Sequence, residues 1–196
     1  MDVGRLVSRA VIGGVFIGHG TQKLFGWFDG PGPAGTAAMM ESLDLRPGKV
    51  HAVLSGVTET VGGSLLAAGL ATPLASAALT GIMTTAIKKV HIPNGPWAVN
   101  GGWEYPAVMI GSVTALAEAG PGDLSLDHAL GTERSGPLWA LAALATGVGA
   151  AALTMAVSRR GPSSLPPTGT SATTAAQGDI VGGQGSPPGQ RPLDAA

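Results

Sequence analysis

Two ionisable side chains, His19 and Glu59, lie well inside long apolar stretches of the sequence. His19 stands eight residues before Trp27, where the first stretch ends, and Glu59 stands eight residues after His51, where the second begins. At about 1.5 Å of rise per residue, each lies roughly 12 Å below the same end of two adjacent antiparallel helices. Ionisable groups in membrane helices cost roughly 2.5–3.5 kcal/mol and usually pair inside the protein. The spacing therefore predicts that the imidazole and the carboxylate meet, either as catalytic groups or as a structural hydrogen bond that fixes helix register.

Further polar side chains gather at the same end of these stretches. Lys23 follows His19 by four residues and shares its helix face, where it either joins the site or extends its ammonium group to the membrane interface. Glu104 begins another apolar stretch on this side, as a ligand-binding group or as a cap of that helix. Lys88 and Lys89 end the third stretch and favour an interpretation as charges that set the membrane topology.

Five apolar segments supply the helices that would hold these groups. They span residues 6–25, 50–70, 74–90, 106–119 and 138–157. A bilayer core about 30 Å thick needs about 20 helical residues, and the first, second and fifth segments meet this length. None of the five has the polar face of a helix in a soluble bundle. We therefore expect an all-α fold of four or five packed transmembrane helices, with the second and third segments as an antiparallel hairpin.

The composition agrees with a membrane protein. Charged residues make up 12% of the chain, about half of the roughly 25% in soluble domains. The chain has 32 glycines, and small residues let membrane helices approach closely, so Gly14-x-x-x-Gly18 and Gly62-Gly63 are predicted packing positions. A net charge of −1 without a basic stripe argues against nucleic acid as a partner.

Several kinds of chemistry are not expected from this sequence. The chain has no cysteine, which excludes disulfides, thiolate metal sites and iron–sulfur clusters held by its own residues. No His-x-x-x-His or Glu-x-x-His pattern is present, so we predict no metal site. Any electron transfer would need an external cofactor or partner.

The connecting segments give weaker signals. Residues 36–43 are predicted to form a short interfacial helix, and Asp127-His128 has the character of a polar surface segment. Residues 159–196 are rich in Ser, Thr, Pro, Gly and Gln, which predicts a disordered tail. Counting basic residues on the two sides of five spans places the N-terminus outside and the tail inside the cell.

A series of motifs in a fixed order resembles the DoxX family of small bacterial membrane proteins. The motifs are Gly18-His-Gly-Thr-Gln-Lys-Leu-Phe-Gly-Trp-Phe28, Gly30-Pro-Gly32, Gly35-Thr-Ala37, Glu59-Thr-Val-Gly-Gly63, Gly69-Leu-Ala-Thr-Pro73, His91-Ile-Pro-Asn-Gly95, Gly101-Gly-Trp-Glu-Tyr105 and Gly120-Pro-Gly-Asp-Leu-Ser-Leu-Asp127. The resemblance covers about residues 5–130. It carries over, as motif positions, His19, Lys23, Glu59, His91, Asn94, Gly102 and Glu104.

The resemblance implies a membrane-embedded antiparallel four-helix bundle over residues 1–131, to which this sequence adds a C-terminal fifth transmembrane helix over residues 132–158. It also implies a multi-pass protein of the bacterial cell membrane, associated with oxidative-stress or sulfur-handling complexes. We expect a redox-associated subunit that binds a quinone or a similar small lipophilic molecule, with Glu59 and His19 as the catalytic groups. Lys23, His91, Asn94 and Glu104 would bind the ligand, and a soluble redox enzyme would be the partner. The alternative is a non-catalytic scaffold that anchors soluble detoxifying enzymes to the lipid bilayer, with residues 36–43 and the tail as docking segments.

Overall fold

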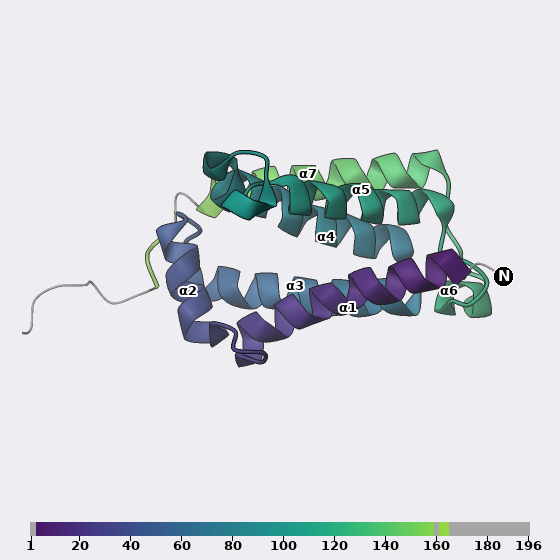
Figure 1. Ribbon diagram of the computed structural model, residues 1–196, viewed down its shortest axis with the longest axis horizontal. Helices are drawn as coiled ribbons and strands as arrows, with labels where there is room; N and C mark the ends of the chain where they lie inside the picture. Colours follow the sequence, from purple (N-terminus) through teal and green to yellow (C-terminus); the bar gives the residue numbers. More distant parts are fainter. Residues whose placement is uncertain (1–2, 159–160, 165–196) are drawn as a thin grey trace, which may run out of the picture. The chain divides into compact units, whose positions relative to one another are not determined.

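The computed structural model describes residues 3–158 and 161–164, and every regular element among them is helical. The long helices are α1 (Val3–Phe25), α3 (Gly48–Ala68), α4 (Thr72–Ala86), α5 (Glu104–Ala119) and α7 (Pro137–Ser158). The short ones are α2 (Gly32–Ser42) and α6 (Leu126–Leu130). Helices α1, α4 and α7 run in one direction, and α3 and α5 run in the other (Figure 1). The predicted all-α fold is confirmed, and each predicted apolar segment falls on one of the five long helices.

Helix α4 does not end at Ala86 but changes its winding. A π-helix, η1 (Ile87–His91), continues it directly, and short 3₁₀ turns follow at η2 (Ile92–Asn94) and η3 (Ala98–Asn100). The continuous helical rod from Thr72 to His91 is about 30 Å long at 1.5 Å per residue, the thickness of a bilayer core. The rod extends the third apolar segment by Thr72, Pro73 and His91. Its last turns are a π-helix, a form of winding that often marks a functional site.

Helices α1 and α3 touch through glycines. A Cβ atom on Gly13 would lie 2.5 Å from the backbone oxygen of Gly63, and one on Gly63 would lie 2.6 Å from that of Gly13. Gly62-Gly63 is therefore a packing position, as predicted. The prediction for Gly14 and Gly18 is wrong, because a Cβ there would meet nothing within 4 Å. The helix is rotated so that Gly13, and not Gly14, faces α3.

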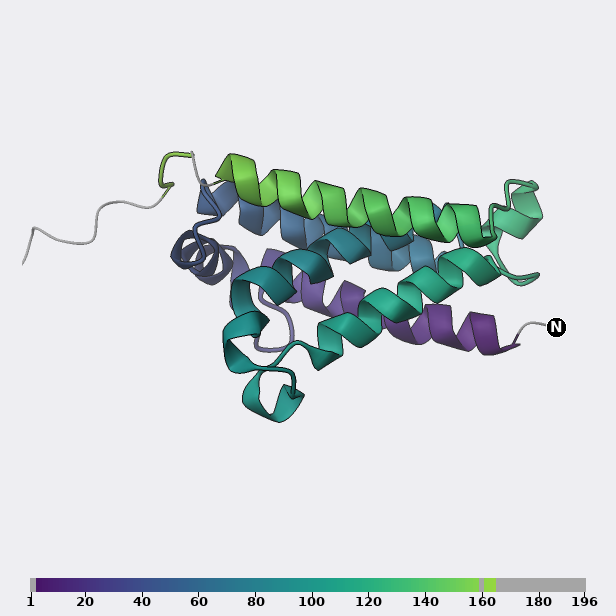
Figure 2. The same ribbon diagram turned by 90° about the horizontal axis from the view of Figure 1, so that it is seen from above.

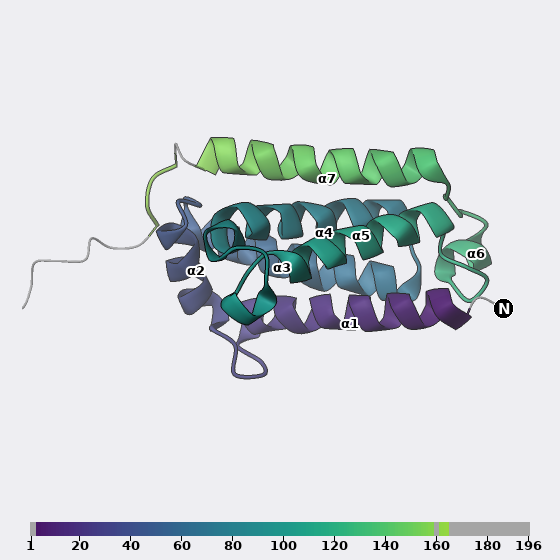
Figure 3. The same cartoon turned by 45° about the horizontal axis from the view of Figure 1, so that its top comes forward.

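Helix α7 packs against α4 and α5, on the side away from α1 (Figures 2 and 3). Gly147 allows the close approach to α4, since its Cβ position lies 2.5 Å from the backbone oxygen of Ala77. Between α1, α3, α4 and α5 lies the main apolar core, whose buried members include Phe16, Leu66, Leu79 and Val113. The fifth helix is thus packed on the outside of a four-helix core.

The outer faces of the long helices are more apolar than those of a soluble bundle, and several polar side chains are buried together with the apolar core. Large apolar residues lie exposed along the outer faces of the long helices, among them Val7, Val11 and Val15 of α1, Val57 and Val61 of α3, and Leu141, Val148 and Leu153 of α7. Polar residues are buried between the helices, among them Arg9, Thr21, Glu59, Ser76, Thr80 and Asp127. Within the described residues, α7 alone combines the length and the apolarity of a membrane span.

Helix α2 lies across the end of α1 and α3 (Figure 1), and it begins four residues earlier than the predicted interfacial helix. Its Glu41 accepts hydrogen bonds from the backbone N–H groups of Ser164 at 2.7 Å and Gly48 at 2.8 Å. These two hydrogen bonds, together with the hydroxyl of Ser164, lower the pKa of Glu41 to about 2. Residues 161–164 therefore bind to α2, whereas the rest of the predicted disordered tail lies outside the described residues.

Candidate functional site

A cavity of about 580 Å³ lies at the end of the bundle that α2 crosses. Its wall is formed by α1, α3, α4 and η1, with residues from α2, the start of α5 and the last turns of α7. Most lining side chains are apolar, and a smaller set is ionisable or hydroxylic: His19, Lys23, His51, Ser55, Thr58, Glu59, Thr85, Lys89, His91, Tyr105 and Thr154. A largely apolar pocket with a few convergent polar groups is the usual form of a small-molecule site.

Glu59 and Lys23 form an ion pair in this wall. The Lys23 Nζ atom donates to the Glu59 Oε2 atom, and the two side chains are 18% and 3% exposed respectively. Glu59 belongs to a stripe of α3 with Gly56 and Gly63, at spacings of three and four residues, and this stripe faces α1. The close approach at these glycines brings the carboxylate against α1 and removes it from solvent.

His19 lines the same cavity but is not the hydrogen-bonding partner of Glu59. Its Nδ1 atom donates to the amide oxygen of Gln22 at 3.2 Å, and the side chain is exposed. The α3-facing stripe of α1 is Gly13, Phe16, Gly20 and Lys23, so His19 lies beside the stripe and Lys23 lies within it. The depth predicted for His19 and Glu59 places both in one cavity, but Lys23 supplies the direct charge partner.

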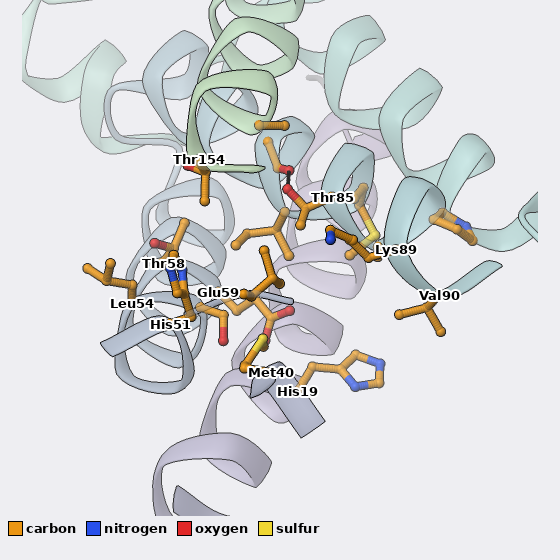
Figure 4. A pocket seen from close by; sticks show the side chains of 18 of the residues that line it. His19, Met40, His51, Leu54, Thr58, Glu59, Thr85, Lys89, Val90 and Thr154 are labelled. Carbon is orange, nitrogen blue, oxygen red and sulfur yellow. Dashed lines mark hydrogen bonds between the residues drawn. The ribbon is translucent and has the colours of Figure 1, made fainter. Parts of the chain in front are cut away.

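Two more histidines reach the cavity from other elements. In α3, His51 lies 2.8 Å from the hydroxyl of Ser158 through its Nε2 atom, which connects α3 to the end of α7. His91, in η1, donates from Nδ1 to the backbone oxygen of Gly101 at 2.7 Å. Figure 4 shows His19, His51 and Glu59 around the cavity. Within the described residues, no group of three or more His, Asp or Glu side chains is placed to hold a metal ion.

The sequence comparison covers the helices that form most of this wall. The DoxX family model matches residues 4–92, from α1 to the first residue of η2. This segment of the chain is a DoxX-family domain. No curated protein and no solved structure matches it. DoxX proteins are membrane proteins, so this chain contacts the lipid bilayer.

The DoxX match contains four of the six site residues expected from the sequence, namely His19, Lys23, Glu59 and His91, and all four line the cavity. Asn94 and Glu104 lie beyond the match and do not line it. Asn94 donates to the backbone oxygen of Gly101 at 3.2 Å, and Glu104 accepts from the backbone N–H of Ala98 at 2.9 Å. In this structure both side chains stabilise the loop between η1 and α5 through these hydrogen bonds.

Lys89 is a cavity residue that the sequence interpretation assigned to topology. Its Nζ atom donates to the backbone oxygen of Leu43 at 2.6 Å, at the end of α2. The neighbouring Lys88 is exposed and does not line the cavity. Lys89 stands four residues after Thr85, which also lines the cavity, so helical spacing was the signal that could have assigned Lys89 to this site.

The opposite end of the DoxX bundle contains a second buried polar group that sequence reasoning missed. Asp127 was predicted to be a surface residue, but it is 2% exposed. It accepts from the backbone N–H groups of Ala71 at 3.0 Å and Thr72 at 3.3 Å. These amides begin α4 and have no partners within the helix, so the carboxylate caps them. The prediction is wrong because the loop with α6 folds over the turn between α3 and α4.

Proposed function

We propose that this DoxX protein is a multi-pass protein of the bacterial cell membrane. In this proposal α1, α3, α4 and α5 cross as an antiparallel four-helix core over residues 1–131, and α7 crosses as a fifth span. The exposed apolar faces of α1, α3 and α7, with ionisable groups buried between the helices, support this arrangement. Soluble monomers rarely expose such continuous apolar surface.

The end that carries α2 is assigned to the cytoplasm. Arg46, Lys49 and Lys88 lie at this end, whereas Arg9 at the opposite end is buried and donates to the backbone oxygen of Leu124 at 2.7 Å. Removing Arg9 from the count of exposed charges strengthens the positive bias of the α2 end. The N-terminus is then outside and the C-terminus inside.

The proposed biochemical role is binding of a quinone, or a similar small lipophilic molecule, by a redox-associated subunit. The observation that carries this proposal is the buried Glu59–Lys23 pair in a largely apolar cavity. An ion pair is costly to bury and weak evidence for stability alone, so its position in a ligand-sized cavity favours a functional role. A cavity of about 580 Å³ is within the usual range of small-molecule sites.

The chemistry matches the groups that the cavity contains. Reduction of a quinone to a hydroquinone adds two electrons and two protons, and its carbonyl oxygens then become hydroxyls. Lys23 or His19 would donate a hydrogen bond to a carbonyl oxygen. Glu59, a carboxylate in its pair with Lys23, would first take up a proton from water and then pass it to one quinone oxygen, and the second proton would come from water. The electrons would come from a flavin or haem partner enzyme, since the chain has no cysteine to carry a thiol redox couple.

The scaffold hypothesis receives less support from the described residues. It requires α2 as a docking segment, yet Thr36, Ala37 and Met40 of α2 are buried, and Met39 and Met40 line the cavity. The tail, its other docking segment, lies beyond the described residues except for 161–164.

The test measures binding of a benzoquinone with a decyl tail to the purified full chain in lipid nanodiscs. We expect Glu59→Gln and His19→Ala to lower quinone affinity about 10-fold or more while the bundle stays folded, because each loses one polar contact in an apolar site. Glu133→Gln and His128→Ala are matched controls. These two residues pair with each other at 3.1 Å, outside the cavity, and should leave binding unchanged. Unchanged binding in both cavity variants would refute the proposal and favour the scaffold.

A further inference from the structure

The charges that line the cavity do not balance. Among the lining residues that the structure describes, Lys23 and Lys89 are cationic and Glu59 is the one carboxylate. Glu59 is already paired with Lys23. The remaining ammonium group, on Lys89, has the neutral backbone oxygen of Leu43 as its hydrogen-bond acceptor. A partly buried cation without a counter-charge is costly, and a bound anion removes that cost.

The direction of Lys89 follows from the backbone that carries it. Ala78, Ile82 and Thr85 of α4 line the cavity, and Lys89 follows them on the same helix face at spacings of three and four residues, whereas Lys88 is exposed. Figure 4 shows Lys89 together with Glu59 and His51 around the cavity. An ammonium group has three N–H donors, so Lys89 can bind Leu43 and still offer donors to a ligand.

The other residues that line the cavity indicate the chemical character of the uncharged part of that ligand. Phe16, Met40, Ile82 and Met83 contribute apolar surface. Methionines adapt to irregular apolar partners, which suits a flexible chain better than a rigid one. The cavity therefore combines one unpaired cation with an apolar interior of ligand size.

From this combination we infer that the cavity takes a single-chain lipophilic monoanion, such as a long-chain carboxylate, whose charged group pairs with Lys89. The inference rests on the cavity of the proposed function and names the charge of its ligand. A neutral quinone would leave Lys89 without a counter-charge, whereas a carboxylate or an ionised hydroxyquinone would supply one.

The experiment uses the full chain in nanodiscs of neutral phosphatidylcholine at pH 8. Fluorescent cis-parinaric acid is displaced by dodecanoate or by its uncharged methyl ester, which has the same alkyl chain. We expect the wild-type protein to bind the acid about 10-fold or more tightly than the ester, because only the acid forms a charge-assisted contact. Equal affinity for the acid and the ester would overturn the inference without any variant.

Variants of Lys89 test whether this residue causes the preference for the acid over the ester. We expect Lys89→Gln to lose the preference for the acid while its affinity for the ester stays within about 2-fold, which also shows that the cavity is folded. Lys89→Arg should retain the preference, and Lys88→Gln is the matched control that leaves it unchanged. A preference that survives Lys89→Gln would overturn the assignment. Displacement by added phosphatidylglycerol, without displacement by dodecanoate, would identify a lipid headgroup instead and also overturn it.

The outcome is separable from that of the proposed function. Quinone binding that depends on Glu59, with no discrimination between acid and ester, refutes the anion inference and leaves the quinone proposal intact. An acid preference that depends on Lys89, with quinone binding unaffected by both Glu59→Gln and His19→Ala, supports the anion inference and refutes the quinone proposal.

Discussion

Replacing Lys23 with methionine keeps much of the side-chain volume and removes the charge that faces Glu59. The Glu59 side chain is 3% exposed, so its carboxylate would be left buried without a counter-charge. Removal of one member of a buried ion pair costs about 3–5 kcal/mol. The opposite change, Glu59→Gln, leaves the ammonium group of Lys23, which is 18% exposed and can be hydrated. We expect that change to cost only about 1 kcal/mol.

The two costs predict a measurable asymmetry. For a chain of 150–250 residues, 1 kcal/mol shifts the melting temperature by about 2–4 °C, so Lys23→Met should lower it by about 6–20 °C and Glu59→Gln by about 2–4 °C. The double variant should resemble Glu59→Gln, because no charge is then left unpaired. Thermal unfolding in detergent, followed by fluorescence of the four tryptophans, measures all three. Equal losses in the two single variants, which then add in the double variant, would refute the pairing.

Two further predictions test other contacts. Gly13→Ala should destabilise the bundle by about 1–3 kcal/mol, because the new methyl would lie 2.5 Å from the backbone oxygen of Gly63. In the control Gly14→Ala the new methyl meets nothing within 4 Å, so this change should be neutral or stabilise by up to about 1 kcal/mol. Equal melting temperatures of the two variants would contradict this packing. Glu41 should titrate by NMR at about pH 2, so its stabilising effect is complete above pH 4.5 and is lost as the pH falls through about 2. Ser164→Pro removes both the N–H and the hydroxyl that Glu41 accepts and should raise the pKa toward 4.5, whereas an unchanged midpoint would exclude this contact.

The positions of the long helices could be predicted from the sequence. Long apolar runs, interrupted at Gly and Pro residues such as Gly69 and Pro73, limit where helices can begin and end. Depth along a helix was also predictable, because the rise per residue is constant. Counting residues from Trp27 and His51 therefore placed His19 and Glu59 at the level of one cavity.

Rotation about each helix axis could not be predicted in the same way. The packing face of α1 contains Gly13, Phe16, Gly20 and Lys23 at alternating spacings of three and four residues. The competing set with Gly14 and Gly18 has an equally plausible small-residue spacing. Only the contact with Gly63 decides between them, and this choice makes Lys23 the partner of Glu59 and leaves His19 beside it.

The amino-acid sequence by itself thus determined the helices, their order and the depth of the polar groups, since these depend on local hydrophobicity and constant helical rise. The tertiary structure decided which side chains face one another. It placed Lys89 in the cavity wall against the end of α2 and buried Asp127 beneath a loop. Both outcomes depend on close packing and hydrogen bonds between segments far apart in the chain, such as the bond from Lys89 to Leu43, which no local pattern encodes.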